Sequence, residues 1–420
     1  MNRATIFLLL PAAVACGLRE LGETVPEAPL PDYIDTFRSS TVVTGIAYPD
    51  GSGWGSSGAP SSSDVPEIVM YRDGELVLSI PVKAENFVPE DVDMQHYSGG
   101  HIYTDFSTDS ETIVARDGVE LFRYAGRERI VFLAENDGGR VLTLGESRSG
   151  KGFSSRADGV PVFLGLDGTV YPNAGLSPDG ELRFFYTVGI NSTAGKVQQH
   201  YAVTGTENIR IELPPEVRSV YGFAFPPSSP PDSGEGLTAL CRCRNEYGKY
   251  VPCLVDISDG SFTELPGLLN KSPRIYGAAV LENAAPLLAS CSCQDRGLLP
   301  LSYTCVFSGQ SRPALWLQDN IPLGFRHCAD SVAGVQKSMS GEGRDVLCNG
   351  YRRDTLPAGY TVMAGDALCC APGGLKVGLT SRNGGRAILW NGGRIDSLGF
   401  RGIVTGVFEE RTWEGDSHAY

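Results

Sequence analysis

Short apolar runs of strand length recur along most of this chain, and turn residues separate them. Within the runs apolar positions tend to alternate, as in Leu76, Leu78 and Ile80. Five turn dipeptides lie between such runs: Asp73-Gly74, Asp117-Gly118, Asp167-Gly168, Asp259-Gly260 and Asn391-Gly392. Each can supply the positive φ angles that a two-residue hairpin requires. The pattern therefore predicts antiparallel strands joined in hairpins.

The same pattern repeats at an interval of about fifty residues, which is typical of β-propeller blades. Ala239-Leu240-Cys241-Arg242-Cys243 aligns with Ala289-Ser290-Cys291-Ser292-Cys293, and Glu212-Leu213-Pro214 recurs as Glu264-Leu265-Pro266. No convincing amphipathic helix interrupts the strands. We therefore expect an all-β fold, a propeller of about seven four-stranded blades, with six or eight left open by the C-terminal spacing.

The two ends of the repeat array predict how the ring closes. Ile403–Phe408 is a lone strand after the last hairpin, whereas the first repeat, at Val42–Tyr48, begins with a strand that resembles the second strand of the others. The C-terminal strand can supply the missing inner strand of the first blade. Such a closure removes free sheet edges that would invite aggregation.

Composition narrows the function without assigning it. The 420 residues include 52 Gly and 27 Pro, as many tight turns require. The formal net charge is −14, which argues against a nucleic-acid partner because phosphates demand clustered Lys and Arg.

The N-terminal segment has the features of an export signal. Arg3 is followed by the apolar stretch Ile6–Val14, which is too short to span a membrane. Cleavage at the Ala15–Cys16 bond suits an ordinary signal peptidase. Ala13-Val14-Ala15-Cys16 also resembles a bacterial lipobox, and this resemblance implies that Cys16 becomes a lipidated N-terminus. A secreted protein with an incidental Cys16 is the alternative.

These features divide the chain into four parts. We expect a signal peptide at 1–15, a lipidated and flexible tether at 16–39, the propeller at 40–410 and a tail at 411–420.

Cysteines other than Cys16 cluster between Cys241 and Cys370. Folding the strands about their turns brings Cys241 opposite Cys253, and either Cys291 or Cys293 opposite Cys305. Opposed cysteines in an exported chain are candidates for disulfides. Reduced buried cysteines and a zinc site are the alternatives, although no histidine lies at ligand spacing, so no metal site is assigned.

No catalytic motif stands out. Gly145–Gly152 resembles a phosphate-binding loop but ends in Gly where Ser or Thr is required, and no cofactor is implied. His96 and His101 flank a turn and suit an exposed loop or an inner strand better than a metal site. Trp54, in a glycine-rich loop, is a candidate for ligand binding through its exposed ring, with burial against the propeller as the alternative.

Two segments resemble bacterial propeller families. Ala387–Gly399 is similar to the repeat of extracellular HAF-type proteins, and Leu176–Leu182 is similar to the Ser-Pro-Asp-Gly repeat of TolB-like propellers. Each resemblance covers a single blade. Together they imply a β-propeller lipoprotein of the bacterial envelope, a class largely without assigned activity, and they transfer no catalytic residue.

The sequence therefore favours a lipid-anchored, non-catalytic binding or structural module at a bacterial cell envelope, on the outer membrane. A glycan or protein ligand is expected at the mouth of the central channel. The alternative is a glycan lyase or hydrolase with two facing carboxylates there. A scaffold that uses an apolar patch on the rim is the third hypothesis.

Overall fold

The computed structural model describes residues 37–48, 66–81, 95–107, 110–148, 152–192, 195–224, 237–264, 274–281, 288–294, 302–308, 314–316, 320–328, 331–338, 344–349, 352–371 and 374–413. Every regular element in these ranges is a strand. None of the described residues forms a helix long and apolar enough to cross a membrane. Cys16 and Trp54 lie outside the described residues.

Three four-stranded antiparallel sheets follow one another in the first half of the described chain. The first contains β4 (Gln95–Ser98), β5 (His101–Ser107), β6 (Glu111–Arg116) and β7 (Val119–Ala125). The second contains β8 (Glu128–Glu135), β9 (Val141–Ser147), β10 (Phe153–Ala157) and β11 (Val160–Gly165). The third contains β12 (Gly168–Leu176), β13 (Leu182–Ser192), β14 (Gly195–Thr204) and β15 (Glu207–Ile211).

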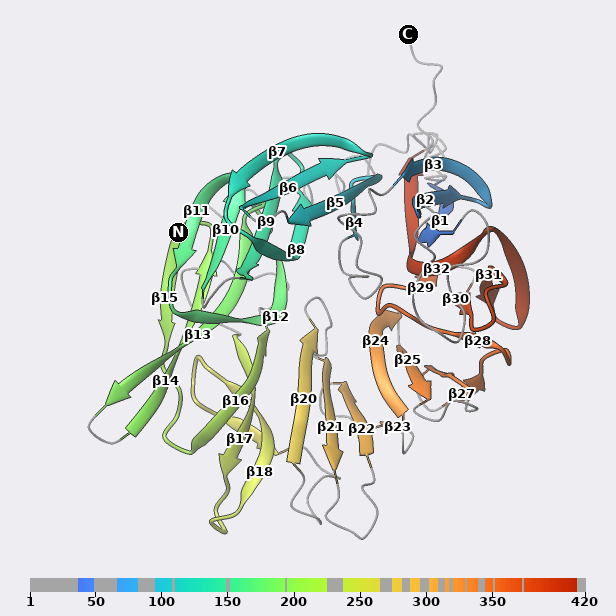
Figure 1. Ribbon diagram of the computed structural model, residues 1–420. Coiled ribbons are helices and arrows are strands. Elements are labelled where there is room, and N and C mark those ends of the chain that lie inside the picture. The colour runs from blue at the N-terminus through green and yellow to red at the C-terminus, as the bar shows by residue number, and fades with distance from the viewer. Residues whose placement is uncertain are drawn as a thin grey trace, which may run out of the picture. The chain divides into compact units, whose positions relative to one another are not determined.

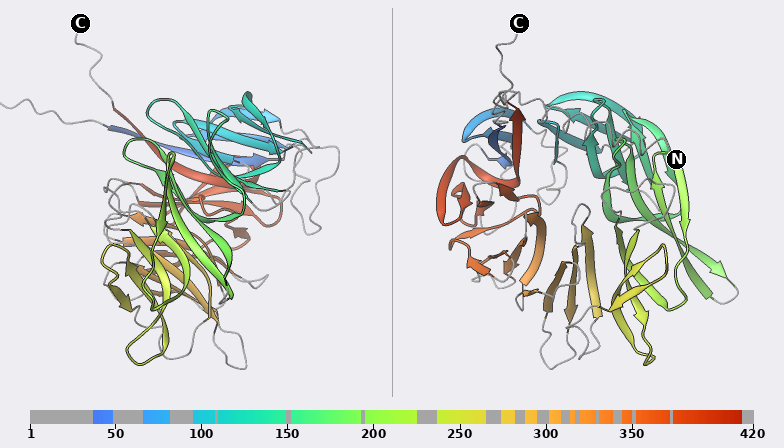
Figure 2. Two further views of the ribbon diagram at one scale, coloured as in Figure 1. Left: turned by 90° about the vertical axis from the view of Figure 1, so that its left-hand side faces the viewer. Right: turned by 180° about the vertical axis from the view of Figure 1, so that it is seen from behind.

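Three more four-stranded sheets continue the series. They are β16 (Val217–Ala224), β17 (Thr238–Arg244), β18 (Tyr250–Asp256) and β19 (Phe262–Glu264); then β20 (Arg274–Leu281), β21 (Leu288–Gln294), β22 (Ser302–Ser308) and β23 (Ala314–Trp316); then β24 (Asn320–Cys328), β25 (Ser331–Ser338), β26 (Val346–Asn349) and β27 (Arg352–Thr355). Within the compact unit Ser40–Glu410, the sheets succeed one another around a central axis (Figures 1 and 2). The fold is an all-β propeller, as the strand repeat predicts.

A larger sheet joins the two ends of the array. It contains β28 (Tyr360–Thr361), β29 (Leu368–Ala371), β30 (Gly374–Ser381), β31 (Arg386–Asn391), β32 (Arg394–Trp413), β1 (Phe37–Ala47), β2 (Glu67–Arg72) and β3 (Glu75–Pro81). Strand β32 pairs with β31 and lies beside β1 in this sheet. The backbone N–H of Tyr48 donates to the carbonyl of Arg401 at 2.8 Å. The C-terminal strand thus joins the first repeat, as expected.

Burial along the strands follows the packing of sheet against sheet. The middle strands β2 and β10 are buried over most of their length, because neighbouring sheets cover both of their faces. The outermost strands β3 and β7 are largely exposed, and Leu76 and Val119 are among their exposed side chains. The core consists of apolar clusters, and one of them joins Leu144 and Phe153 to Phe184 of the following sheet.

Four of the five dipeptides lie at hairpins, but only two of them form the two-residue turn as predicted. Asp73-Gly74 and Asp117-Gly118 have positive φ and close the hairpins β2–β3 and β6–β7. Asp259-Gly260 lies between the paired strands β18 and β19, and the hairpin after Asn391 turns at Gly392-Gly393.

Asp167-Gly168 does not form a hairpin. It connects β11 to β12, which belong to different sheets. The hairpin of that repeat turns instead at Asp158-Gly159, where both φ angles are positive and Ala157 pairs with Val160.

Candidate functional site

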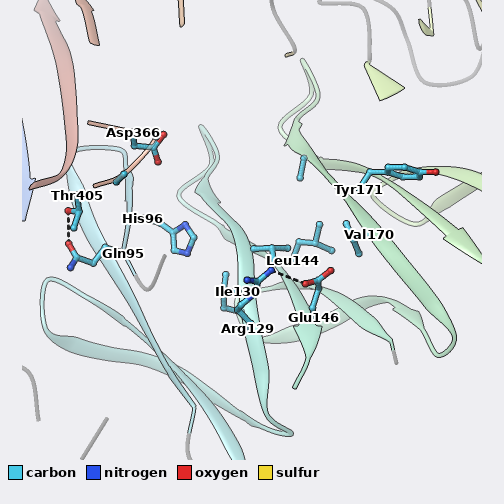
Figure 3. Close-up of a pocket in the computed structure, with 14 residues that line it drawn as sticks. Gln95, His96, Arg129, Ile130, Leu144, Glu146, Val170, Tyr171, Asp366 and Thr405 are labelled. Carbon is cyan, nitrogen blue, oxygen red and sulfur yellow. Dashed lines mark hydrogen bonds and ion pairs between the residues drawn. The ribbon is translucent and has the colours of Figure 1, made fainter. Parts of the chain in front are cut away.

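A cavity of about 600 Å³ lies where the inner strands of several sheets converge (Figure 3). Strands β4, β8 and β12, each the first of its sheet, line it together with β9, with β32 and with the segment 364–366 before β29. Small-molecule sites in proteins commonly occupy roughly 300–1,000 Å³. The cavity is therefore large enough for a small ligand.

The closing strand β32 supplies part of the wall through Thr405. The Thr405 hydroxyl donates to Gln95 Oε1 on β4 at 3.1 Å, and it lies 2.9 Å from the Thr44 hydroxyl on β1. Strand β32 also holds the segment 364–366, because the N–H of Val407 donates to the carbonyl of Asp366 at 2.8 Å. The closing strand β32 therefore contributes both to the sheet that joins the chain ends and to this wall of the cavity.

His96 faces the cavity from β4, beside Asp366 (Figure 3). Its Nε2 is buried, has no hydrogen-bond partner among the described residues, and lies 3.9 Å from Asp105 Oδ1. Burial lowers the pKa of His96 to about 4, and the Asp366 carboxylate opposes this effect. At neutral pH the imidazole is uncharged, and a neutral imidazole both donates and accepts hydrogen bonds.

An ion pair occupies the side of the cavity formed by β8 and β9. Arg129 Nη2 lies 3.1 Å from Glu146 Oε2, and both side chains are partly exposed. Exposed pairs of this kind add little stability. Their local effect is that the guanidinium and the carboxylate largely neutralise each other at the cavity wall.

The apolar residues that border the cavity contribute little surface to it. Ile130 on β8 and Leu144 on β9 are 1% and 0% exposed and pack into the cores between the sheets, and Val170 on β12 is partly buried. Tyr171 lines the cavity as well, and its hydroxyl lies 2.9 Å from Nδ1 of the buried His200. Burial lowers the pKa of His200 to about 4, so this histidine is also neutral at pH 7. The surface that the cavity presents is therefore mainly polar.

The structure confirms the predicted pairing of strands β17 and β18 at the cysteines but contradicts the predicted disulfide. Cys241 lies directly opposite Cys253, yet Cys253 is bonded to Cys243, with 6.2 Å between their Cα atoms. A diagonal pair can be bridged at this separation. Cys241 is a free cysteine, and burial raises the pKa of its thiol to about 12.

The other cysteine predictions concern backbone positions that the structure describes. Cys291 lies opposite Cys305, whereas Cys293 lies opposite Tyr303 and is diagonal to Cys305, as Cys243 is to Cys253. A bond from Cys305 to either cysteine stays a prediction. Cys370, which the sequence did not single out, is disulfide-bonded.

Most cavity residues carried no motif in the sequence. His96 was considered for a loop or an inner strand, and it lies on the inner strand β4, whereas His101 on β5 pairs with Asp117 at 2.6 Å. Gln95, Asp366 and Thr405 were not identified, because they come from distant segments of ordinary composition. No group of three His, Cys, Asp or Glu side chains within the described ranges is placed to hold a metal ion.

Comparisons with known proteins give the fold alone. No protein-family model and no curated protein matches the chain. Among solved structures, the β-propeller domain of the Trilobed protease from Pyrococcus furiosus is 10% identical with a TM-score of 0.43, over 71% of this chain and 91% of that one.

Two further solved structures are similar at the same level. Dihydro-heme d1 dehydrogenase NirN, in complex with DHE, is 12% identical with a TM-score of 0.47, over 87% of this chain and 74% of that one. A puromycin-hydrolyzing peptidase from Mycobacterium tuberculosis is 14% identical with a TM-score of 0.40, over 77% of this chain and 55% of that one. All three TM-scores are below 0.5, and nothing about activity follows from these similarities.

Proposed function

We propose that this protein is an exported, lipid-anchored β-propeller that binds a small ligand in its axial cavity without transforming it. The observation that carries the proposal is the convergence of β4, β8, β12 and β32 on one cavity of about 600 Å³ that is lined by several polar side chains. Ligand sites are typically concave and contain a few polar groups that fix the orientation of the ligand.

Export to a bacterial envelope, with Cys16 holding the protein to the outer membrane, is part of the proposal. The disulfide between Cys243 and Cys253 supports it, because disulfides persist in oxidising compartments and are rare in the cytosol. If the anchor is real, Cys16→Ala should move the protein from the membrane to the soluble fraction. Unchanged membrane retention would rule out the anchor.

The larger sheet also supports a count of blades. Strand β32 has 20 residues, pairs with β31 through its first part, and lies beside β1 in the sheet order. We propose that it is shared by two blades, one made with β28–β31 and the other with β1–β3. The ring then has eight blades, one of the numbers that the sequence leaves open beside seven.

Binding is tested by filling the cavity. Ala364 lies in the segment before β29 and lines the cavity, so Ala364→Trp should occupy part of it. A soluble metabolite library, screened by thermal unfolding, should contain compounds that raise the melting temperature of the parent protein, since a ligand at a hundred times its Kd adds about 2.7 kcal/mol. The shift should disappear in Ala364→Trp and persist in Ala125→Trp, which changes an exposed alanine on β7. Equal shifts in all three proteins would contradict the proposal.

The glycan-processing enzyme remains the second candidate because two carboxylates, Glu146 and Asp366, line the cavity. We favour binding because Glu146 is already paired with Arg129 at 3.1 Å. Release of reducing ends from an oligosaccharide panel by the parent protein, abolished by Glu146→Gln or Asp366→Asn, would favour the enzyme instead.

A further inference from the structure

Three cysteines of the sheet β16–β19 lie on one face, and only two of them are bonded to each other. Cys243 on β17 forms a disulfide with Cys253 on β18, whereas Cys241, two residues before Cys243, is a free thiol. Residues i and i+2 of a strand point to the same face, and the register places Cys241 directly opposite Cys253. All three side chains belong to one apolar cluster and have no exposed surface. Cys253 therefore has two cysteines close to it on the neighbouring strand.

The backbone suits a bond from Cys253 to either cysteine. Cys253 Sγ lies 3.7 Å from the carbonyl oxygen of Cys241, although it is bonded to Cys243 across a Cα separation of 6.2 Å. Directly opposed residues of an antiparallel pair have Cα atoms about 4.5–5.5 Å apart, a distance that disulfides span. The sequence separation of the bonded residues would change only from 10 to 12. The loop-closure entropy of the two bonds is therefore nearly equal.

We infer that Cys241, Cys243 and Cys253 form an intramolecular thiol–disulfide exchange site, in which Cys253 changes partner between the other two. The thiolate of Cys241 attacks Sγ of Cys253, and a new S–S bond forms as the bond to Cys243 breaks. The electron pair of the broken bond leaves on Cys243, which takes up a proton from the medium in place of the one that Cys241 released. One thiol and one disulfide are present before and after, so no oxidant or reductant is required. The site does not depend on the ligand-binding function proposed above.

Burial controls when this exchange runs. It raises the pKa of the Cys241 thiol to about 12, and only the thiolate is nucleophilic. At pH 7 the attacking species is rare, so the bond between Cys243 and Cys253 persists. Opening of the hairpin β17–β18 would hydrate the thiol and return its pKa toward the ordinary value of about 8.5. The site thus converts a transient opening of this hairpin into a lasting change of covalent structure.

The next sheet repeats the arrangement in its backbone. Strand β21 contains Cys291 and Cys293, and β22 contains Cys305, with Cys291 directly opposite and Cys293 in the diagonal position. Two consecutive sheets therefore hold three cysteines in the same register. A structural disulfide needs two cysteines, whereas exchange of partners needs a third one beside them.

The experiment follows the disulfide in the folded, full-length protein. Samples held at pH 7, 8 and 9 are quenched with acid, their thiols are blocked with a maleimide in urea at pH 6, and tryptic peptides are mapped by mass spectrometry. Trypsin cleaves after Arg242 and so separates Cys241 from Cys243. We expect only the bond between Cys243 and Cys253 at the start, and then a growing fraction of Cys241 linked to Cys253. This fraction should form about tenfold faster per pH unit, as the thiolate fraction rises, with no change in the number of thiols.

Matched variants separate partner exchange from general scrambling. Cys241→Ser removes the attacking thiol, so the bond between Cys243 and Cys253 should stay unchanged at every pH. Cys369→Ser changes a buried cysteine of β29, outside this set, and should leave the exchange rate as it is. Cys243→Ser, isolated under oxidising conditions, should fold with Cys241 linked to Cys253.

Three results would overturn the inference. The first is a parent protein that keeps only its original bond after about a day at pH 9. The second is a Cys243→Ser variant in which Cys241 and Cys253 both stay reduced. The third is a set of bonds from Cys253 to cysteines of other sheets that appear equally fast in the parent and in Cys241→Ser, because these would show scrambling without a dedicated site.

Discussion

Burial, more than any charged or hydrogen-bonded neighbour, shifts the pKa values of three interior side chains. His96 and His200 lie in different sheets, yet desolvation lowers the pKa of each to about 4. Cys241 shows the same effect in the other direction, since burial raises its thiol pKa to about 12. Both histidines are thus neutral at pH 7, and the thiol is protonated and poorly reactive.

The buried His96 predicts a dependence of stability on pH. Its pKa is about 4 in the folded state and 6.5 in the reference state, so between these values the unfolded chain binds the proton that the folded chain excludes. Stability is therefore lost as the pH falls from 6.5 to 4, by up to roughly 3 kcal/mol from this residue.

His96→Gln should reduce the slope of unfolding free energy against pH by about 1.4 kcal/mol per pH unit in this window. Urea unfolding at pH 7, 5.5 and 4.5 measures it. A variant with the same slope as the parent would show that His96 does not titrate as its burial implies.

The disulfide predicts a specific peptide map. Arg242 lies between Cys241 and Cys243, so trypsin separates the two cysteines. Digestion of the unfolded, unreduced and alkylated protein should give a linked pair of peptides that contain Cys243 and Cys253, with Cys241 alkylated. Mass spectrometry that finds Cys241 linked to Cys253 would restore the directly opposed pairing.

At the scale of elements, the sequence predicts where turn residues lie but not which two strands each turn connects. Asp73-Gly74 and Asp117-Gly118 form hairpins because their φ angles are positive. Asp167-Gly168 has the same composition but links two sheets, and Asp158-Gly159 makes the turn instead. Nothing local distinguishes these two dipeptides. The difference arises from which strands pair.

Strand β32 depends on close contact with β1, and Gly402 shows how close it is. Its φ is +150°, and a Cβ at this position would lie 1.9 Å from the carbonyl oxygen of Ile46. Gly402→Ala should therefore force the two strands apart and lower the unfolding free energy by roughly 2–3 kcal/mol.

The matched control is Gly189→Ala on β13, where a Cβ would meet no atom within 4 Å. It should change stability by no more than about 0.5 kcal/mol. Urea unfolding of both variants compares them directly. Equal changes in the unfolding free energy of the two variants would mean that the close contact between β32 and β1 at Gly402 has no special role in stability.

At the scale of the whole molecule, the sequence predicts the ring better than the site. The repeat of strands and the lone segment Ile403–Phe408 are enough to anticipate a propeller closed by its C-terminal strand. The cavity residues Gln95, Asp366 and Thr405 meet only after closure, so no spacing in the chain marks them. His96 was considered for an inner strand, because it and His101 are the only two of the five histidines that lie close together in the sequence.

Ring closure by β1 and β32, which also forms the polar wall of the cavity, is the claim on which the fold and the function both depend. It is tested most directly by oxidative cross-linking of Thr44→Cys/Thr405→Cys, because the two hydroxyl oxygens lie 2.9 Å apart. Peptide mapping should find residue 44 linked to residue 405, and should find no such link when Thr44→Cys is combined with Thr187→Cys on β13. Closure is contradicted if residues 44 and 405 remain unlinked and both react with a thiol reagent in the folded protein.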